Sequence, residues 1–238
     1  MNRPDSLLNR LIDRLEFESS LAPDLPTTIQ QSDMVARPDT DTESKRLLPE
    51  MCRTLEELET LCRDREELRT DLAGTRLVFG SGDPDAHIMI IGEAPGEEED
   101  HQGVPFVGAA GELLTKILQA IELNRNDVYI ANILKHRPPG NRNPSEEERQ
   151  RSLPFLLQQI ELVNPMLILA LGRVASTTLL GTDATLKSLR GRIHPFGKRE
   201  LMVTYHPAAL LRNPSWKRPV WEDVQRLRKH YDERVATK

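Results

Sequence analysis

The sequence of 238 residues has little cysteine and no long apolar run. Its two cysteines, Cys52 and Cys62, are too few for a disulfide framework or a four-cysteine metal site. No segment approaches the roughly 20 apolar residues of a membrane-spanning helix, and the first residues lack the apolar core of a secretory signal. These absences argue against a secreted disulfide scaffold and a membrane protein, so we expect a cytoplasmic protein with no membrane partner.

An excess of positive charge is also lacking, since the formal net charge is −5. This balance argues against a protein that coats nucleic acid without discrimination. The charge is unevenly placed: residues 1–100 hold 24 acidic and 11 basic side chains, whereas residues 187–238 hold 13 basic and 5 acidic ones. A basic surface at one end can meet a phosphate backbone. A solvated C-terminal helix would explain most of these charges equally well, so charge alone leaves the partner open.

The first 45 residues differ in composition from the remainder. Leucine and isoleucine recur near helical spacing over residues 5–19, which predicts a helix, and the proline-containing polar stretch of residues 22–43 predicts a flexible linker. We therefore divide the chain into an N-terminal helix and linker, residues 1–45, and a folded domain, residues 46–238. Residues 1–45 either dock on the protein's own surface or tether a protein partner.

The folded domain has the pattern of an α/β protein. A helix is predicted over residues 47–72, before the first strand. Apolar runs then predict four strands, at residues 87–91, 127–134, 165–171 and 201–204. Amphipathic segments predict helices over residues 110–121, 143–163, 173–180 and 219–235, the second of them opening at Asn143-Pro144-Ser145-Glu146.

Strands separated by helices predict a mainly parallel, four-stranded sheet covered on both faces, which is a three-layer α/β/α fold. In such sheets the functional residues gather at the carboxyl ends of the strands.

The first predicted strand ends in a glycine- and proline-rich turn, Gly92-Glu93-Ala94-Pro95-Gly96. Such a turn brings backbone amides close to a ligand, while Glu93 projects from the strand end. A plain connection with a solvated glutamate explains the segment equally well. The acidic run at residues 97–100 is most simply a solvated face at the start of a helix.

Three further residues stand at or near predicted strand ends. Phe106 lies between glycines before a helix, where its ring is either a stacking platform for a nucleobase or a core side chain. Asn132 interrupts an apolar strand and needs a partner, either neighbouring backbone or the edge of a ligand. His206 precedes an apolar loop with a basic tip, which suits entry into a DNA groove, although a lone histidine is more often structural.

Taken in this order, the motifs resemble the family 4 uracil-DNA glycosylases. The resemblance covers nearly all of residues 74–227. It is carried by five stretches: Gly92–Asp100, Gly103–Gly108, Val128–Lys135, Arg137–Arg142 and His206–Pro214. Each motif alone is moderate evidence, and their succession at these intervals is strong evidence.

The resemblance implies that DNA binds at the carboxyl edge of the sheet, where the extruded uracil enters a pocket. Phe106 would then stack on the base, Asn132 would bond its N3–H and O4, and His206 would bond O2. The turn formed by Gly92, Ala94, Pro95 and Gly96 would line the pocket, and Glu93 would help to place the attacking water.

The implied activity is hydrolysis of the N-glycosidic bond of uracil in single- or double-stranded DNA. Base flipping would present the uracil, and an abasic site would remain. No lysine is placed for lyase chemistry, so we expect a monofunctional enzyme that acts as a monomer. The residues expected to contact DNA are Pro207, Ala208, Leu210, Leu211, Arg212, Asn213, Arg142 and Arg190.

The sequence departs from the family at the cysteines that usually hold a four-iron cluster. His136 stands where one cysteine precedes Arg-Pro-Pro, and Ser152 stands 16 residues later. The upstream pair falls near Arg65 and Leu68. Iron–sulfur clusters require thiolates, so we expect no cluster and no other metal, because a zinc site at Cys62 and His136 would have too few ligands.

Two other functions remain open at this point. A member of the same superfamily could act on another deaminated base, or the domain could be a non-catalytic module that binds DNA or protein. The loss of the cluster motivates the second alternative. The retention of Phe106, Asn132 and His206 favours uracil excision over both.

Overall fold

The computed structural model describes residues 47–236, and residues 1–46 and 237–238 lie outside the described part. The helix predicted over residues 5–19 and the linker predicted over residues 22–43 are therefore outside it. Among the described residues, no helix has the length and apolar character required to cross a bilayer.

A sheet at the centre of the domain has the strand order β1-β3-β2-β4-β6-β5. The four central strands are parallel, which confirms the predicted parallel sheet. The strands are β1 (Ser81–Gly82), β2 (Ile88–Gly92), β3 (Tyr129–Asn132), β4 (Leu167–Leu171), β5 (Ile193–Phe196) and β6 (Arg199–Thr204).

Two short antiparallel strands, β1 and β5, extend this sheet at its edges and were not predicted. β1 has only two residues, and β5 contains Pro195, a residue that is confined to edge strands, strand starts and bulges. The sheet therefore has six strands where the sequence predicted four, and the added strands protect its edges.

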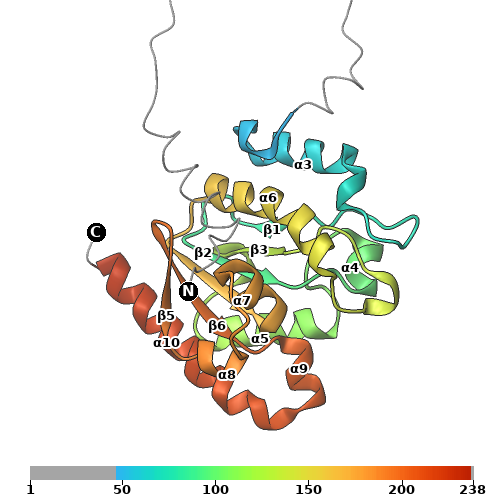
Figure 1. The fold of residues 1–238 in the computed structure, drawn as a ribbon. Helices are drawn as coiled ribbons and strands as arrows, with labels where there is room; N and C mark the ends of the chain where they lie inside the picture. Colours follow the sequence, from blue (N-terminus) through green and yellow to red (C-terminus); the bar gives the residue numbers. More distant parts are fainter. Residues whose placement is uncertain (1–46, 237–238) are drawn as a thin grey trace, which may run out of the picture. The chain divides into compact units, whose positions relative to one another are not determined.

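Helices cover both faces of the sheet, as the three-layer prediction requires (Figure 1). α6 and α7 pack on one face, with α3 against α6, and α5, α9 and α10 pack on the other. The helices are α3 (Leu55–Asp64), α4 (Glu97–Gln102), α5 (Ala109–Ala120), α6 (Glu146–Val163), α7 (Gly172–Leu180), α8 (Leu186–Leu189), α9 (Pro207–Arg212) and α10 (Lys217–Ala236). Short 3₁₀ turns occur at Pro49–Met51, Glu66–Leu68, Arg125–Asp127, Pro139–Asn141 and Pro214–Trp216.

The apolar core follows from the alternation of side chains along the strands. Ile88 and Ile90 of β2 point to the face covered by α5 and α10, where they pack with Leu114 and Leu227. A second cluster between α3 and α6 is formed by Cys52, Leu58, Leu61, Cys62, Leu68, Phe79 and Phe155. The first cluster closes one face of the sheet, and the second packs α3 against α6.

The helix predicted over residues 47–72 is wrong in its extent. α3 begins after Thr54, whose side chain accepts a hydrogen bond from the Glu57 amide, and it ends at Arg65. Arg65 has extended backbone angles, and its guanidinium donates to the carbonyl of Leu47. The regularly spaced leucines therefore belong to one helix, which holds Leu55, Leu58 and Leu61, and to one separate 3₁₀ turn, which holds Leu68.

The start of α6 also differs from the prediction. Ser145, and not Asn143, caps the helix: its hydroxyl accepts from the Glu148 amide at 3.2 Å, while the Glu148 carboxylate accepts from the Ser145 amide at 2.7 Å. This reciprocal capping box leaves Pro144 outside the helix and Asn143 free to face the site.

Candidate active site

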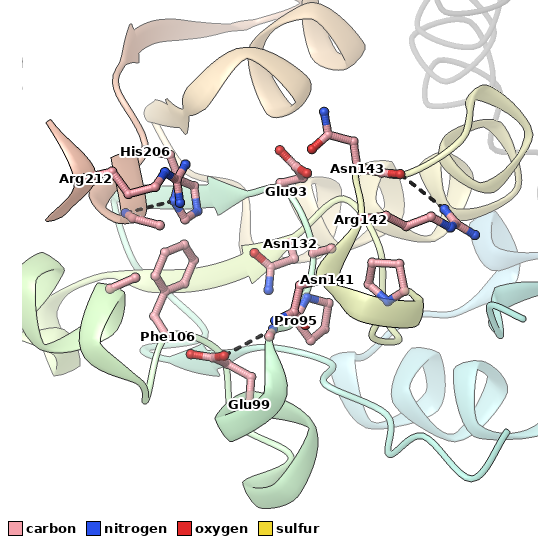
Figure 2. Close-up of a pocket in the computed structure, with 15 residues that line it drawn as sticks. Glu93, Pro95, Glu99, Phe106, Asn132, Asn141, Arg142, Asn143, His206 and Arg212 are labelled. Atoms are coloured by element: carbon pink, nitrogen blue, oxygen red, sulfur yellow. Dashed lines mark hydrogen bonds between the residues drawn. The ribbon is translucent and has the colours of Figure 1, made fainter. Parts of the chain in front are cut away.

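A pocket of about 330 Å³ lies at the carboxyl ends of β2 and β3, beside the start of α9. Figure 2 shows Phe106, Asn132 and His206 around one space. The pocket is lined by Glu93, Ala94, Pro95, Gly96, Glu99, Phe106, Ala110, Asn132, Pro138, Asn141, Arg142, Asn143, His206, Ala208 and Arg212. The structure therefore brings together, in one cavity, most of the residues that the sequence indicated.

Asn132 lies at the last position of β3, paired with Gly92 of the neighbouring strand. Its side chain is 1% exposed, and its Oδ1 has no hydrogen-bond partner among the described residues. An unsatisfied buried acceptor costs about 1–3 kcal/mol. Gly92 is not among the lining residues, but it makes room for the site, because a Cβ there would lie 2.6 Å from the ring of Phe106 and would also collide with Asn132.

Phe106 is held in a backbone conformation that few non-glycine residues adopt, with φ of 55°. The guanidinium of Arg125 supports it, donating to the carbonyl oxygens of Phe106 at 2.9 Å and Pro105 at 2.8 Å. Gly111 allows the loop to fold against α5, since any Cβ there would collide with the Phe106 carbonyl. The ring consequently has a fixed orientation, with its centroid 5.4 Å from that of His206.

His206 is the N-cap of α9, where Pro207 occupies the first helical turn. Its Nδ1 accepts a hydrogen bond from the Ala208 amide at 3.2 Å, so the proton of the neutral ring is carried by Nε2. Burial, together with the nearby charge of Arg212, lowers the pKa of His206 to about 4. The imidazole is thus neutral at physiological pH, with an N–H donor available to the pocket.

Glu99 was predicted to be a solvated acidic residue, and this prediction is wrong. Its carboxylate accepts from the amides of Val107 at 2.9 Å, Gly108 at 3.0 Å and Gly96 at 3.1 Å. It therefore joins the turn after β2 to the loop that carries Phe106 (Figure 2). The sequence did not single out Glu99, because it lies within a run of acidic residues. Its place three positions after Gly96 nevertheless matches a capping box.

Glu93 lines the pocket directly after β2. Desolvation raises its pKa, while the charges of Arg149 and Arg212 oppose the shift. Across the pocket, the guanidinium of Arg142 bonds both carboxylate oxygens of Glu148, at 2.7 and 2.8 Å. The pocket thus has a partly desolvated carboxylate and a fixed guanidinium among its lining residues.

The residues predicted to contact DNA separate into two groups. Ala208, Arg212 and Arg142 line the pocket, and Leu211 is 50% exposed beside them. Asn213 caps α9, and its side chain accepts from the hydroxyl of Ser215 at 2.8 Å. This group has the exposure that contact with DNA requires.

The second group is buried or bonded to protein groups and does not line the pocket, in contrast to the prediction. Pro207 and Leu210 are buried because they lie three positions apart on the face of α9 that packs on the domain, with Leu210 in the core beside α5. Arg190 forms an ion pair with Asp223 at 2.8 Å, donates to the carbonyl of Pro219 and lies 5.0 Å from the ring of Tyr205. Its guanidinium therefore stabilises the fold.

Several lining residues were not singled out from the sequence. They are Glu99, Ala110, Pro138, Asn141 and Asn143. Pro138 and Asn141 belong to the Arg137–Arg142 stretch that carried part of the resemblance, so that motif was the available signal. Asn141 also has a positive φ of 54°, which asparagine tolerates better than most residues.

The residues at the family's cluster positions do not fit an iron–sulfur cluster. His136 is bonded through Nδ1 to the hydroxyl of Thr75 at 3.1 Å, and Ser152 donates to the carbonyl of Ile133 at 2.7 Å. Leu68 is a core residue, and Arg65 is bonded to the backbone. None of these four supplies a thiolate. Within residues 47–236, no three His, Cys, Asp or Glu side chains form a group that could hold a metal ion.

A buried lysine fills the space behind β3. The Lys135 ammonium, 0% exposed, donates to the carbonyl of Asn132 at 3.0 Å and to the side chain of Gln159. Gln159 in turn donates to the carbonyl of Phe79 at 3.0 Å. Burial lowers the pKa of Lys135 to about 8 and raises the pKa of Cys62 to about 12. These contacts anchor the end of β3 to α6.

Comparison with known proteins agrees with this geometry. Residues 79–225 match the model of the uracil DNA glycosylase superfamily. The type-4 uracil-DNA glycosylase of Thermotoga maritima is 42% identical over 183 residues, which cover 74% of this chain and 95% of that protein. Those of Pyrobaculum aerophilum and Sulfurisphaera tokodaii are 43% and 42% identical, over 62% and 65% of this chain and 79% and 74% of theirs. The chain therefore belongs to the uracil-DNA glycosylase superfamily, among the relatives of the type-4 enzymes.

Proposed function

We propose that this protein removes uracil from DNA by hydrolysing the N-glycosidic bond, which leaves an abasic site. The observation that carries the proposal is the unsatisfied Oδ1 of Asn132, buried in a pocket beside the Phe106 ring and the His206 imidazole. A ligand with an N–H group at this position relieves the cost of the orphaned acceptor. The N3–H of uracil is such a group.

Selection of uracil follows from the amide of Asn132. Its Oδ1 accepts from N3–H of uracil, and its Nδ2 donates to O4. Cytosine has an unprotonated N3 and an amino group at these positions, so both contacts become mismatched, at about 1–3 kcal/mol for each unpaired group. Phe106 provides the surface on which the extruded base stacks.

His206 supports the chemical step through its neutral ring. As the glycosidic bond breaks, negative charge develops on uracil O2, and a donor aimed at that atom stabilises the transition state more than the ground state. The Nε2–H is available for this contact because Nδ1 is occupied by the Ala208 amide. We assign the role of water placement to Glu93, whose carboxylate lies in the same pocket.

The proposed reaction is monofunctional and uses one chain. No lysine is among the residues that line the described pocket, so a Schiff base with the sugar has no nucleophile there. One chain supplies every group assigned above. We therefore expect one active site per monomer.

A gel assay tests this function. Single- and double-stranded oligonucleotides with one uracil, hypoxanthine or xanthine are incubated with the protein and cleaved with alkali. Cleavage of the uracil strands alone is expected. Absence of cleavage at every enzyme concentration would disprove the function, and preferential cleavage at hypoxanthine or xanthine would assign it to another deaminated base.

We also propose that the protein works without an iron–sulfur cluster. Support comes from His136, Ser152 and Leu68, which are engaged with protein groups at positions where the family has cysteines. Metal analysis of the purified protein should find far less than one iron per chain, and the Cys52→Ala/Cys62→Ala variant should keep its excision rate. About four irons per chain would overturn the proposal.

A further inference from the structure

A second hollow lies next to the uracil pocket, on the other side of α4. It is a crevice of about 430 Å³ and is lined by Glu59, Arg63, Arg69, Thr75, Arg76, Leu77, Gly103 and His136. Its walls come from the end of α3, the segment before β1, the end of α4 and the loop after β3. Figure 1 shows α4 on the same side of the domain as the loop that connects α3 to β1.

The charges around this crevice are unbalanced. Arg63 is paired with Glu59 on the same helix. Arg69 and Arg76 form no ion pair with any carboxylate of residues 47–236, although both side chains line the crevice. The carbon chain of Arg76 lies over Gly103, whose missing side chain leaves the room for it. Within residues 47–236, two guanidinium groups from different positions are therefore not paired with a carboxylate, although the Asp100 carboxylate accepts from the backbone amide of Arg76 at 2.7 Å.

The chemistry of these groups favours a phosphate. Guanidinium presents a planar set of N–H donors that matches the oxygen atoms of a phosphate group. Thr75 also lines this wall, where its hydroxyl is bonded to His136 Nδ1 at 3.1 Å. A positively charged crevice that is open to solvent can bind a phosphodiester or a free phosphate ion. The same side chains would contact the phosphate oxygens in both cases.

The position of the crevice distinguishes between these sources. Gly96, just before α4, lines the uracil pocket, and Gly103, just after it, lines the crevice. A helix of six residues is about 9 Å long, which corresponds to about two to three nucleotides at 3.4 Å per nucleotide along one strand. The loop after β3 also reaches both hollows, through Pro138 and His136.

We propose that this crevice binds a backbone phosphate of the damaged strand, two to three nucleotides from the extruded uracil. The proposal rests on the function proposed above and adds a contact outside the base pocket. Because a phosphate contact fixes the register of the strand without reading its sequence, Arg69 and Arg76 would hold the DNA while the base is extruded.

The test compares Arg69→Gln and Arg76→Gln with Lys229→Gln, which removes one positive charge from α10, away from both hollows. Binding to an oligonucleotide with a stable abasic-site analogue is measured by fluorescence anisotropy over a range of NaCl concentrations. Each arginine variant should bind about five- to tenfold more weakly at low salt, with a log–log salt slope reduced by about 0.7–0.9. Lys229→Gln should match the wild type.

Oligonucleotide length gives a second measurement. Shortening the strand to fewer than three nucleotides on one side of the lesion should weaken binding by the wild type and leave binding by the arginine variants unchanged. Equal salt slopes and equal length dependence in the wild type and both variants would overturn the proposal.

Inorganic phosphate tests the other source at constant ionic strength, with chloride as the control. If phosphate raises the melting temperature of the wild type but not of Arg69→Gln, while DNA binding is the same for both, the crevice binds free phosphate and the DNA proposal is wrong. Uracil excision by the wild type on the same strands is scored separately. Loss of excision would contradict the proposed function, whereas the binding comparison tests the crevice by itself.

Discussion

The imidazole of His206 has one observed partner, the Ala208 amide at Nδ1, and one proposed partner, uracil O2 at Nε2; only the neutral ring serves both. Its Nδ1 caps α9 by accepting from the Ala208 amide, which assigns the proton to Nε2. A protonated ring would lose the cap and gain a charge in a desolvated position beside Arg212. The lowered pKa, about 4, is the consequence of this arrangement. Capping and transition-state stabilisation therefore depend on one protonation state.

Two substitutions at this residue separate the two roles. His206→Ala should lower the single-turnover excision rate by about 10²–10³-fold, the usual effect of losing one donor to a developing oxyanion, and should cost about 1 kcal/mol through the lost cap. His206→Asn should restore the cap and the stability but not the rate, because its side chain is shorter. A near-normal rate in either variant would refute the assignment.

Substitution of Asn132 should affect the excision rate and the free energy of unfolding differently. Asn132→Leu replaces an unsatisfied buried acceptor by an apolar group of similar size, and such replacements are neutral or stabilising. We expect excision to be lost, while the free energy of unfolding in urea stays within about 1 kcal/mol of the wild type or rises. A large loss of stability would mean that Asn132 has protein partners and is not reserved for a ligand.

At the scale of elements, the site depends on how the turn after β2 is joined to the Phe106 loop. Glu99→Gln should weaken this connection, because the amide group of glutamine points a donor at one of three backbone N–H groups. We expect a loss of about 1–3 kcal/mol in unfolding free energy and at least a tenfold lower kcat/KM. The neighbouring exposed residue provides the control, since Glu98→Gln should change neither quantity.

Elements whose signal is local in the sequence could be predicted, and those that depend on contacts with other segments could not. The four central strands are apolar runs, and their carboxyl ends carry Glu93, Asn132 and His206, so the sequence placed these residues correctly. Glu99 could not be distinguished from its acidic neighbours, because its partners are backbone amides up to nine residues away. The same limit explains α3, whose end is determined by a contact of Arg65 with Leu47.

At the scale of the whole molecule, the buried ionisable groups predict how stability changes with acid. The folded-state pKa of His206 lies near 4, below its ordinary value of 6.5, so its neutral form stabilises the fold above pH 6.5 and this contribution is lost as the pH falls towards 4. Glu148, bonded to Arg142, has its pKa lowered from 4.5 to about 2, and its contribution is lost between those values.

Urea denaturation at successive pH values should therefore show two regions of declining stability. His206→Asn should reduce the slope of the first, between pH 6.5 and 4, to which His136 also contributes because burial lowers its pKa, and should leave the second unchanged. Glu148→Gln should flatten only the second, between pH 4.5 and 2. A decline of equal slope in the wild type and in both variants would show that other groups control acid unfolding.

The overall architecture was easier to predict than its edges. Alternating apolar and amphipathic segments determine the three layers, because each layer must bury one face. β1 and β5 are only two and four residues long, too short for a periodic signal, and the burial of Leu210 and Pro207 depends on the direction in which α9 leaves the sheet. That direction is set by packing between segments that are far apart in the sequence, so no local sequence pattern predicts it.

Gly92 restricts the routes by which this pocket can acquire a new specificity. A Cβ at this position would collide with both Phe106 and Asn132. Any other residue at position 92 requires a smaller ring at position 106 and a shorter amide at position 132 at the same time. A variant with only one of these changes therefore has a damaged pocket. Exposed positions at the rim, such as Asn143, carry no comparable constraint. Natural or laboratory selection for other bases should therefore accumulate changes at the rim while position 92 remains glycine.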